Sequence, residues 1–360
     1  MYDAAGPGTS VYLPTPGNEP DAAHKIELEW RSLRAELAGQ GAPEADLRAI
    51  DTVVGTDRGL DTPRGQAIFA TDGAVVLSRE LSVPPAAPRG RFDDLPDGVP
   101  LLAQTPDLGD YLLVLVDRQE AEIELRSREH GAAARDEHVR GRDRPLTKVS
   151  SGDWRQDHRQ RKAENTWKAN ARDVAARVKE LAGAYDVELI AVCGDVRART
   201  LLMEQLGALG RSRAVELPTT GFPPGADRAH AHVAAERIAA RCEYDRRAAV
   251  LDRYRQGLAN GTAAGGLDAV VDALRSGEVA TLLLRYDAPE ADAPVWWGPD
   301  PGQLTLHARE LEGTRAPRIK RGRAADVLIR ALIQTDGDLL MYSGAEPGPD
   351  GVAGAVLRRG

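Results

Sequence analysis

Residues 150–179 read SSGDWRQDHRQRKAENTWKANARDVAARVK, a glycine-containing polar turn that runs directly into a long basic helix. Apolar residues recur along it at steps of three and four, the spacing of one stripe buried against a core. The stripe consists of Ala163, Trp167, Ala171, Val174, Val178 and Leu181. The sequence therefore predicts a long helix that packs on a domain through one face, with its first turns extending beyond the core.

Polar and cationic residues precede this stripe. Gln156, Gln160 and Glu164 are four residues apart and share one helix face. The cationic residues around them are Arg155, Arg159, Arg161 and Lys162. Residues 126–179 hold fifteen Lys/Arg against eight Asp/Glu, in a chain whose formal net charge is -8. Such local charge suits a contact with phosphate. Most charged runs are solvated faces, however, and the residue pattern alone leaves both interpretations open.

The composition narrows the class of protein. A chain of 360 residues is too long to form one small hydrophobic core. The proline- and glycine-rich breaks in its sequence predict three domains. The only two cysteines, Cys193 and Cys242, have no CxxC spacing, so we expect no metal site, disulfide framework or other cofactor. The start of the chain lacks the pattern of a signal peptide, and no window approaches a membrane span. We expect a cytoplasmic protein with no membrane partner.

The domains are expected at 1–96, 97–222 and 223–360. In the first, apolar periodicity predicts helices at 22–37 and 44–54. A hairpin is predicted at 66–70 and 74–78, because Asp72-Gly73 between them suits a tight turn. The proline-rich stretch 84–100 is typical of a linker. This domain is expected to be α+β.

The other two domains are expected to be α/β. The middle one should contain strands at 111–116 and 121–126, a loop, the long basic helix, and a strand at 187–193. After a Pro/Gly-rich break at 217–225, helices are expected at 227–258, 266–277 and 324–333, with strands at 279–284 and 339–342.

Familiar catalytic motifs are absent from the sequence. No P-loop, dinucleotide-binding GxGxxG, HExxH or GxSxG stands at a strand-to-helix junction, which disfavours the enzymes that use them. His230 and His232 are two apart and point to different sides of a helix, so we interpret them as exposed or capping residues. Trp296-Trp297 are expected to pack on their own sheet, although a base could stack there.

Three stretches resemble a known family. Gly152-Asp153-Trp154, followed by the basic helix, is similar to the Gly-Gly-Gln loop and helix of class-one release factors. Residues 265–284, GGLDAVVDALRSGEVATLLL, and 339–359, LLMYSGAEPGPDGVAGAVLRR, resemble parts of their C-terminal domain. The chain resembles the archaeal and eukaryotic class-one peptide release factors with Pelota, and more closely their bacterial branch of the actinobacterial type. The hibernation factor Balon and the Vms1-type peptidyl-tRNA hydrolases lie in the same wider group.

The resemblance covers residues 100–360 and implies a fold. It suggests an RNase-H-like middle domain that carries a variant of the Gly-Gly-Gln loop. The C-terminal domain is expected to be similar to the ribosomal kink-turn-binding proteins. The expected class is therefore a release-factor-like, α/β and α+β multidomain protein.

The departures from the family decide the expected function. Gly-Gly-Gln is replaced by Gly152-Asp153-Trp154, and the carboxylate of Asp153 would oppose an oxyanion. No stop-codon-reading motif is found. The resemblance then implies a ribosome-binding factor that occupies the A site in hibernation or rescue, without conventional stop-codon termination. The RNA-binding residues would be Gly152, Trp154, Arg155, Arg159, Arg161, Lys162 and Lys168.

Two alternatives stay open. The first is a peptidyl-tRNA hydrolase that acts on stalled ribosomes, in which Gln156 or Gln160 positions water. The second is a stress-linked scaffold without ribosome contact. The partners implied are the ribosome through its RNA, peptidyl-tRNA, and a translational GTPase such as elongation factor Tu.

Overall fold

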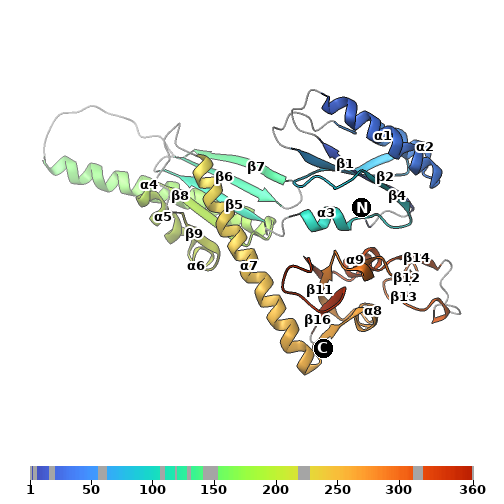
Figure 1. The fold of residues 1–360 in the computed structure, drawn as a ribbon. Coiled ribbons are helices and arrows are strands. Elements are labelled where there is room, and N and C mark those ends of the chain that lie inside the picture. Colours follow the sequence, from blue (N-terminus) through green and yellow to red (C-terminus); the bar gives the residue numbers. More distant parts are fainter. Residues whose placement is uncertain are drawn as a thin grey trace. The chain divides into compact units, whose positions relative to one another are not determined.

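The computed structural model describes residues 2, 6–15, 21–55, 63–105, 110–117, 120–127, 131–140, 153–217, 228–310 and 319–358. Two compact units are present (Figure 1). One consists of Met1–Thr105 with Ala248–Gly360, and the other of Pro106–Arg247. Both units contain sheets and helices, so the expected mixed α/β multidomain class is confirmed. The domain boundaries after residues 96 and 222 stay predictions.

A five-stranded sheet in the order β7-β6-β5-β8-β9 forms the centre of unit 106–247. Its strands are β5 (Tyr111–Val116), β6 (Glu120–Ser127), β7 (Gly131–Arg140), β8 (Leu189–Gly194) and β9 (Ala214–Glu216). Three antiparallel strands are followed by two that run parallel to β5, an arrangement typical of RNase-H-like domains. Every residue of β5 and β8 is buried, as expected for parallel strands covered on both faces.

Helices form a layer on each side of this sheet. On one side, α4 (Asp153–Ala184) and α5 (Val196–Leu206) pack through an apolar cluster on β5 and β6. On the other, the first half of α7 (Arg228–Asn260) packs on β5 and β8. A short helix, α6 (Ala208–Arg213), leads into β9. The expected helices and strands are confirmed, but the loop expected between β6 and the basic helix contains strand β7.

The end of β8 approaches β5 unusually closely. Gly194 has φ of 122°, and a Cβ added there would overlap the carbonyl oxygen of Val116. The next amide, Asp195 N, donates to that same oxygen at 3.0 Å. Glycine is therefore required to bring the two parallel strands to their common carboxyl edge.

The N-terminal part of the other unit is a four-stranded antiparallel sheet in the order β3-β2-β1-β4. The strands are β1 (Gly8–Thr15), β2 (Arg64–Thr71), β3 (Ala74–Leu81) and β4 (Arg89–Asp93). Helices α1 (Ala22–Gly39) and α2 (Glu44–Asp51) cover one face. Asp72 and Gly73 both have positive φ in the β2–β3 turn, so the two helices and the hairpin are confirmed.

The linker expected at 84–100 is wrong. Strand β4 lies within it and pairs with β1, opposite β2. A side chain at Gly90 would meet Leu33 and Leu37 of α1 at about 3.0 Å, so glycine allows helix and strand to touch. Helix α3 (Val99–Gln104) follows and places Leu101 against the second face of the sheet. The prolines flank this strand, where no ladder donor is lost.

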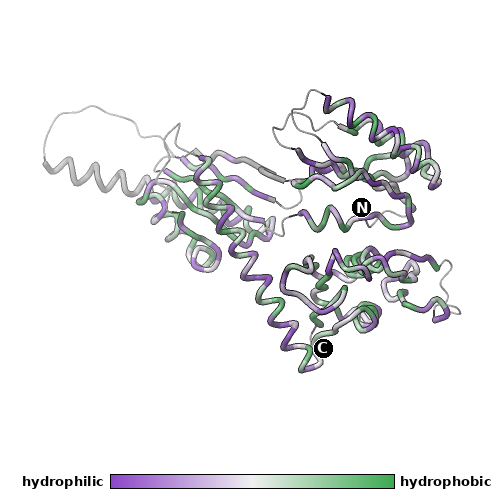
Figure 2. The backbone as a smooth tube through the Cα atoms, viewed as in Figure 1, coloured by the Kyte–Doolittle hydropathy of each residue, from purple (hydrophilic) through white to green (hydrophobic). Residues whose placement is uncertain are grey.

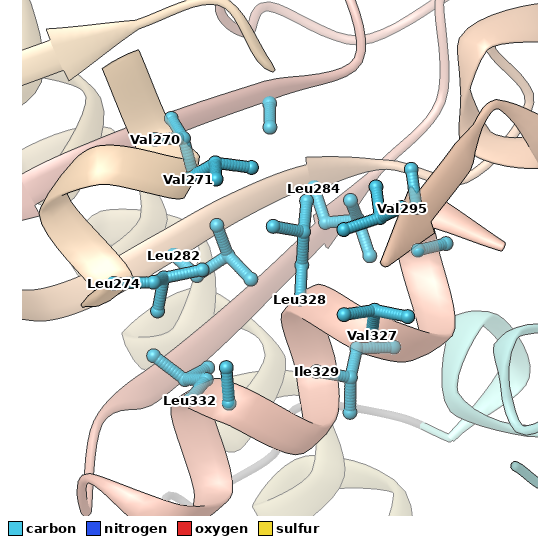
Figure 3. Packing of buried hydrophobic residues seen from close by; sticks show 14 of the residues in the cluster. Val270, Val271, Leu274, Leu282, Leu284, Val295, Val327, Leu328, Ile329 and Leu332 are labelled. Atoms are coloured by element: carbon cyan, nitrogen blue, oxygen red, sulfur yellow. The ribbon is translucent and has the colours of Figure 1, made fainter. Parts of the chain in front are cut away.

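The C-terminal part of the same unit has a second layered core. Its sheet has the order β10-β16-β11-β15, with strands β10 (Ala263–Gly265), β11 (Val279–Arg285), β15 (Asp338–Tyr342) and β16 (Ala353–Leu357). Helices α8 (Leu267–Arg275) and α9 (Ala324–Gln334) cover one face, where aliphatic side chains from helices and strands interdigitate (Figure 3). The last turns of α7 cover the other face. The expected helices and strands of this part are confirmed.

A small sheet in the order β13-β12-β14 extends this core. Its strands are β12 (Pro294–Trp297), β13 (Leu304–Thr305) and β14 (Lys320–Arg323), and two 3-10 helices, η1 (Pro289–Asp292) and η2 (Ala308–Glu310), lie beside them in sequence. Trp297 is buried in the core, as expected, while Trp296 is half-buried under the guanidinium of Arg321.

Replacing Gly194 with alanine tests the close approach of β5 and β8. We expect Gly194→Ala to destabilise unit 106–247 by about 3 kcal/mol or more, because the added Cβ both overlaps a carbonyl and enforces an unfavourable φ. Urea denaturation followed by circular dichroism measures the loss. Gly183→Ala is the matched control. It lies in α4 with nothing within 4 Å of the added Cβ, and it should stabilise the protein slightly. Equal stability of both variants would contradict the strand geometry.

Candidate nucleic-acid interface

Helix α4 is fixed to its sheet by one apolar side. Ala171, Val174, Val178 and Leu181 are buried there, as the sequence predicts. Trp167 is half-buried, and the side chain of Ala163 lies outside the described residues. The helix therefore presents a second, solvated side whose composition determines what it can bind.

Cationic residues form a row along that solvated side. Lys168, Arg172 and Lys179 are exposed, and helical steps of four and seven residues place them on one line. Lys179 donates to the carbonyl oxygen of Gln205 at 2.8 Å, near the carboxyl end of α5, where a cation is favoured. Within the described residues, Lys168 and Arg172 form no ion pair, so their charges face solvent.

The neighbouring cation on α4 has a structural role instead. Arg177 donates to both carboxylate oxygens of Glu137 on β7, each at 2.5 Å, and contacts Glu180 at 2.5 Å. These hydrogen bonds raise the pKa of the Arg177 guanidinium. This bidentate ion pair links the edge strand β7 to α4, so Arg177 is not one of the charges that can bind a partner.

A shallow hollow lies where α4, α5 and the ends of β5 and β6 meet. Its lining includes Trp167, Asn170, Asp173, Arg197 and Asp117. The guanidinium carbon of Arg197 lies 5.3 Å from the centre of the Trp167 ring, within the range of a cation–π contact. The carboxylates in this lining disfavour phosphate, so the hollow does not extend the cationic row as an anion site.

The carboxyl edge of the sheet is organised by capping. Asp195 caps α5 by accepting from the amides of Arg197 and Ala198, both at 3.0 Å. Asp117 accepts from the amide of Glu120 at 2.7 Å. In the part of the chain that the structure describes, no three His, Cys, Asp or Glu side chains are grouped so as to hold a metal ion.

The predicted site residues fall into three groups. Gly152 lies outside the described residues. Trp154, Arg155, Gln156, Arg159, Gln160, Arg161 and Lys162 lie in the first turns of α4, but their side chains are outside the description. Lys168 is exposed on the cationic row. The roles assigned to these residues stay predictions. Arg172, four residues after Lys168, was not among the predicted residues, because placing it on the exposed side required knowing which side of α4 is buried.

His232 has a structural environment that differs from the exposed or capping position expected. Its Nδ1 lies 2.9 Å from Nη2 of Arg126, and its Nε2 lies 3.5 Å from Glu124. Because a guanidinium only donates, Nδ1 must accept this hydrogen bond. His230, two residues earlier, is exposed. The two histidines therefore face different surroundings.

A protein-family model matches part of the chain. Residues 110–260 match the family model for bacterial archaeo-eukaryotic release factor family 2. This part of the chain, which contains the five-stranded sheet and α4, is therefore release-factor-like. The resemblance to the release-factor superfamily that the sequence indicates is confirmed.

Similar proteins extend over nearly the whole chain. The uncharacterized proteins Rv2629 and MT2704 of two Mycobacterium tuberculosis strains, H37Rv and CDC 1551, are each 28% identical over 361 residues, which is 99% of this chain and 95% of the relative. Their names assign no activity.

Solved structures of release-factor relatives are also similar. Archaeoglobus fulgidus Pelota is 16% identical, covers 82% of this chain and 79% of its own, and has a TM-score of 0.32. Dom34 of S. cerevisiae is 12% identical, with 82% and 80% coverage and a TM-score of 0.39. An archaeal translation termination factor, aRF1, is 15% identical, with 98% and 92% coverage and a TM-score of 0.26. These likenesses carry no functional argument.

None of the helices in the described ranges is long and apolar enough to span a bilayer. The longest two, α4 and α7, carry charged residues throughout.

The contact between Arg177 and Glu137 is expected to hold β7 in place. Arg177→Ala should lower the free energy of unfolding, because it leaves the half-buried Glu137 carboxylate without its two donors. Hydrogen exchange of residues 131–140 should accelerate. Arg255→Ala is the control. Its ion pair with Asp252 is exposed, and its loss should cost under about 0.5 kcal/mol. Unchanged exchange in β7 would contradict this role.

Proposed function

We propose that this protein is a release-factor-like translation factor that binds the ribosomal A site through α4, in hibernation or rescue, without conventional stop-codon termination. The observation that carries the proposal is the exposed cationic row of Lys168 and Arg172, on a helix inside the region that matches a release-factor family. Ribosomal RNA presents dense phosphate, which such a row can bind while the chain as a whole stays acidic.

The position of the row along α4 also supports a contact with RNA. The helix has 32 residues and is about 48 Å long at 1.5 Å per residue. Its described buried side chains begin at Asn170. Arg161 is seven residues before Lys168, so its backbone lies on the same helical row. The sequence thus supplies a further cationic residue at the position one heptad toward the amino-terminal turns.

Ribosome binding and its dependence on salt test the proposal. Two charge-reversal variants should no longer co-sediment with bacterial ribosomes at physiological salt. The first is Lys168→Glu/Arg172→Glu, and the second reverses the charges of Arg155, Arg159, Arg161 and Lys162. Where residual binding is measurable, the slope of log affinity against log salt should become shallower by roughly 0.7–0.9 for each phosphate that the variant no longer binds.

A charge-matched control separates the cationic row from net charge. Arg31→Glu/Arg48→Glu changes the charge of the protein by the same amount as the Lys168/Arg172 pair, at exposed positions of α1 and α2. This variant should still bind. Equal binding by the row variants, with their fold intact by circular dichroism, would exclude α4 as the ribosome contact. Adding elongation factor Tu with GTP to the co-sedimentation samples tests whether a translational GTPase strengthens binding.

The hydrolase alternative rests on Gln156 and Gln160, which lie one turn apart in α4. If either positions water, wild-type protein should release peptide from peptidyl-tRNA on stalled ribosomes. Gln156→Ala/Gln160→Ala should then reduce release at least a hundredfold while ribosome binding persists. Glu164→Ala, one turn further along α4, is the matched control. Binding without release by wild-type protein would leave the hibernation role and eliminate the hydrolase.

A further inference from the structure

A cluster of charged side chains is buried inside the unit that contains both ends of the chain. Asp97 precedes α3, Arg323 ends β14, and Asp326 lies in the first turn of α9. The side chains of Asp97, Asp326 and Arg323 are exposed by only 1%, 4% and 11%. Charged groups this deeply buried require partners, and here the partners come from two distant parts of the sequence.

One guanidinium joins the two parts. Arg323 Nη1 donates to Asp97 Oδ1 at 2.5 Å and lies 3.4 Å from Asp326 Oδ2. Its Nε donates to Asp292 Oδ1 at 2.5 Å, but the Asp292 side chain is 72% exposed. The buried cation therefore serves two buried carboxylates, one from residues 1–105 and one from residues 248–360.

Asp97 is the better satisfied of the two carboxylates. Its second oxygen accepts a hydrogen bond from Arg89 of β4. Its backbone amide donates to Ser10 Oγ at 3.1 Å, and its carbonyl oxygen accepts from the Tyr12 hydroxyl at 2.5 Å. These bonds fix Asp97 to strands β1 and β4, so the N-terminal sheet supplies a firmly held anion.

Asp326 is held more loosely. Besides the 3.4 Å approach to Arg323, its Oδ1 lies 3.4 Å from the Tyr2 hydroxyl. Burial and, to a smaller extent, the charge of Asp97 raise the pKa of Asp326 to about 7, against the opposing effects of Arg323, Arg91 and the hydrogen bond from Tyr2. The titratable and charged groups around it are Tyr2, Tyr12, Arg89, Arg91, Asp97, Asp292 and Arg323.

Apolar packing and a second ion pair belong to the same contact between residues 1–105 and residues 248–360, which we call the seam. Leu95 and Val99 insert into the core formed by α8, α9 and β11. Lys320 Nζ donates to Asp94 Oδ1 at 2.6 Å. The charged cluster is thus one part of a continuous contact between the N-terminal sheet and the C-terminal core.

We propose that Asp97, Arg323 and Asp326 form a proton-operated clasp between residues 1–105 and residues 248–360, which a proton on Asp326 strengthens and its loss weakens. When Asp326 is ionised, two buried carboxylates share one buried cation. When it is protonated, the repulsion from Asp97 disappears and the cost of burying a second charge is removed.

The direction of the pH effect follows from proton linkage. In the closed state Asp326 binds its proton with a pKa near 7, whereas in an open, hydrated seam it regains the ordinary value of 3.8. Between these values the closed state holds more protons than the open one, so closure weakens as pH rises. Because one proton is coupled to opening, the opening equilibrium constant increases at most tenfold per pH unit. Above about pH 8 Asp326 is ionised in both states, and the constant no longer changes with pH.

Hydrogen exchange on the full chain between pH 5.5 and 8.5 measures this directly. After correction for intrinsic exchange, peptides covering residues 89–103 and 319–330 should show an opening equilibrium that increases about tenfold or more from pH 5.5 to 7.5 and then levels off. Asp326→Asn, which mimics the protonated carboxyl, should remove this pH dependence and keep the seam protected at pH 8.

Asp292→Asn is the matched control, because it changes another carboxylate on the same guanidinium that is already solvated. Its pH profile should follow that of the wild type. A wild-type profile without slope over this range overturns the proposal, whether or not Asp326→Asn folds. A slope that persists in Asp326→Asn also overturns it, because another group then binds the proton.

Discussion

Both units depend on the burial of a single helix, α7, at its two ends. Its first half presents Ala231, Ala235 and Ala239 to β5 and β8. Its last turns place Val250, Leu251 and Tyr254 on the C-terminal sheet. Hydrophobic and hydrophilic residues alternate along the helix (Figure 2), because each turn must supply one apolar side and leave the rest to water. Without α7, two apolar sheet faces would be exposed.

The basic residues of this structure have two different roles, which depend on whether a carboxylate pairs with them. Arg177, Arg126 and Arg323 are basic residues with carboxylate partners and half-buried or buried side chains. Their charges stabilise the fold and are largely compensated. Lys168 and Arg172 differ because they face solvent along one helical row. A sequence-wide charge count cannot distinguish these two uses, whereas burial and pairing distinguish them directly.

The sequence predicted the elements whose signal is local. Helices α1, α2, α8 and α9 follow from apolar periodicity, and the β2–β3 hairpin follows from Asp72-Gly73. Strand β7 was missed because its sequence, GAAARDEHVR, shows no apolar alternation and it depends on pairing with β6. Strand β4 was hidden among prolines, and its pairing with β1 is equally non-local.

The same limit applies to the sites. Lys168 was predicted from its helix and stays a prediction, whereas the contact between Asp97 and Arg323 joins residues 226 apart, for which no local pattern exists. The helical row that includes Arg172 required knowing which side of α4 is buried. Residue spacing can place a side chain on a helix face, but only packing shows whether that face meets water or a core.

The close approach of β5 and β8 at Gly194 has a consequence for recognising distant relatives of this fold. Where relatives share only 28% of their residues, most core positions can exchange one aliphatic side chain for another of similar volume. Gly194 cannot, since any Cβ would collide with the main chain of the neighbouring strand. In distant homologues that retain this strand pair, a glycine directly after an apolar strand should mark the equivalent position and anchor an alignment where overall similarity has faded.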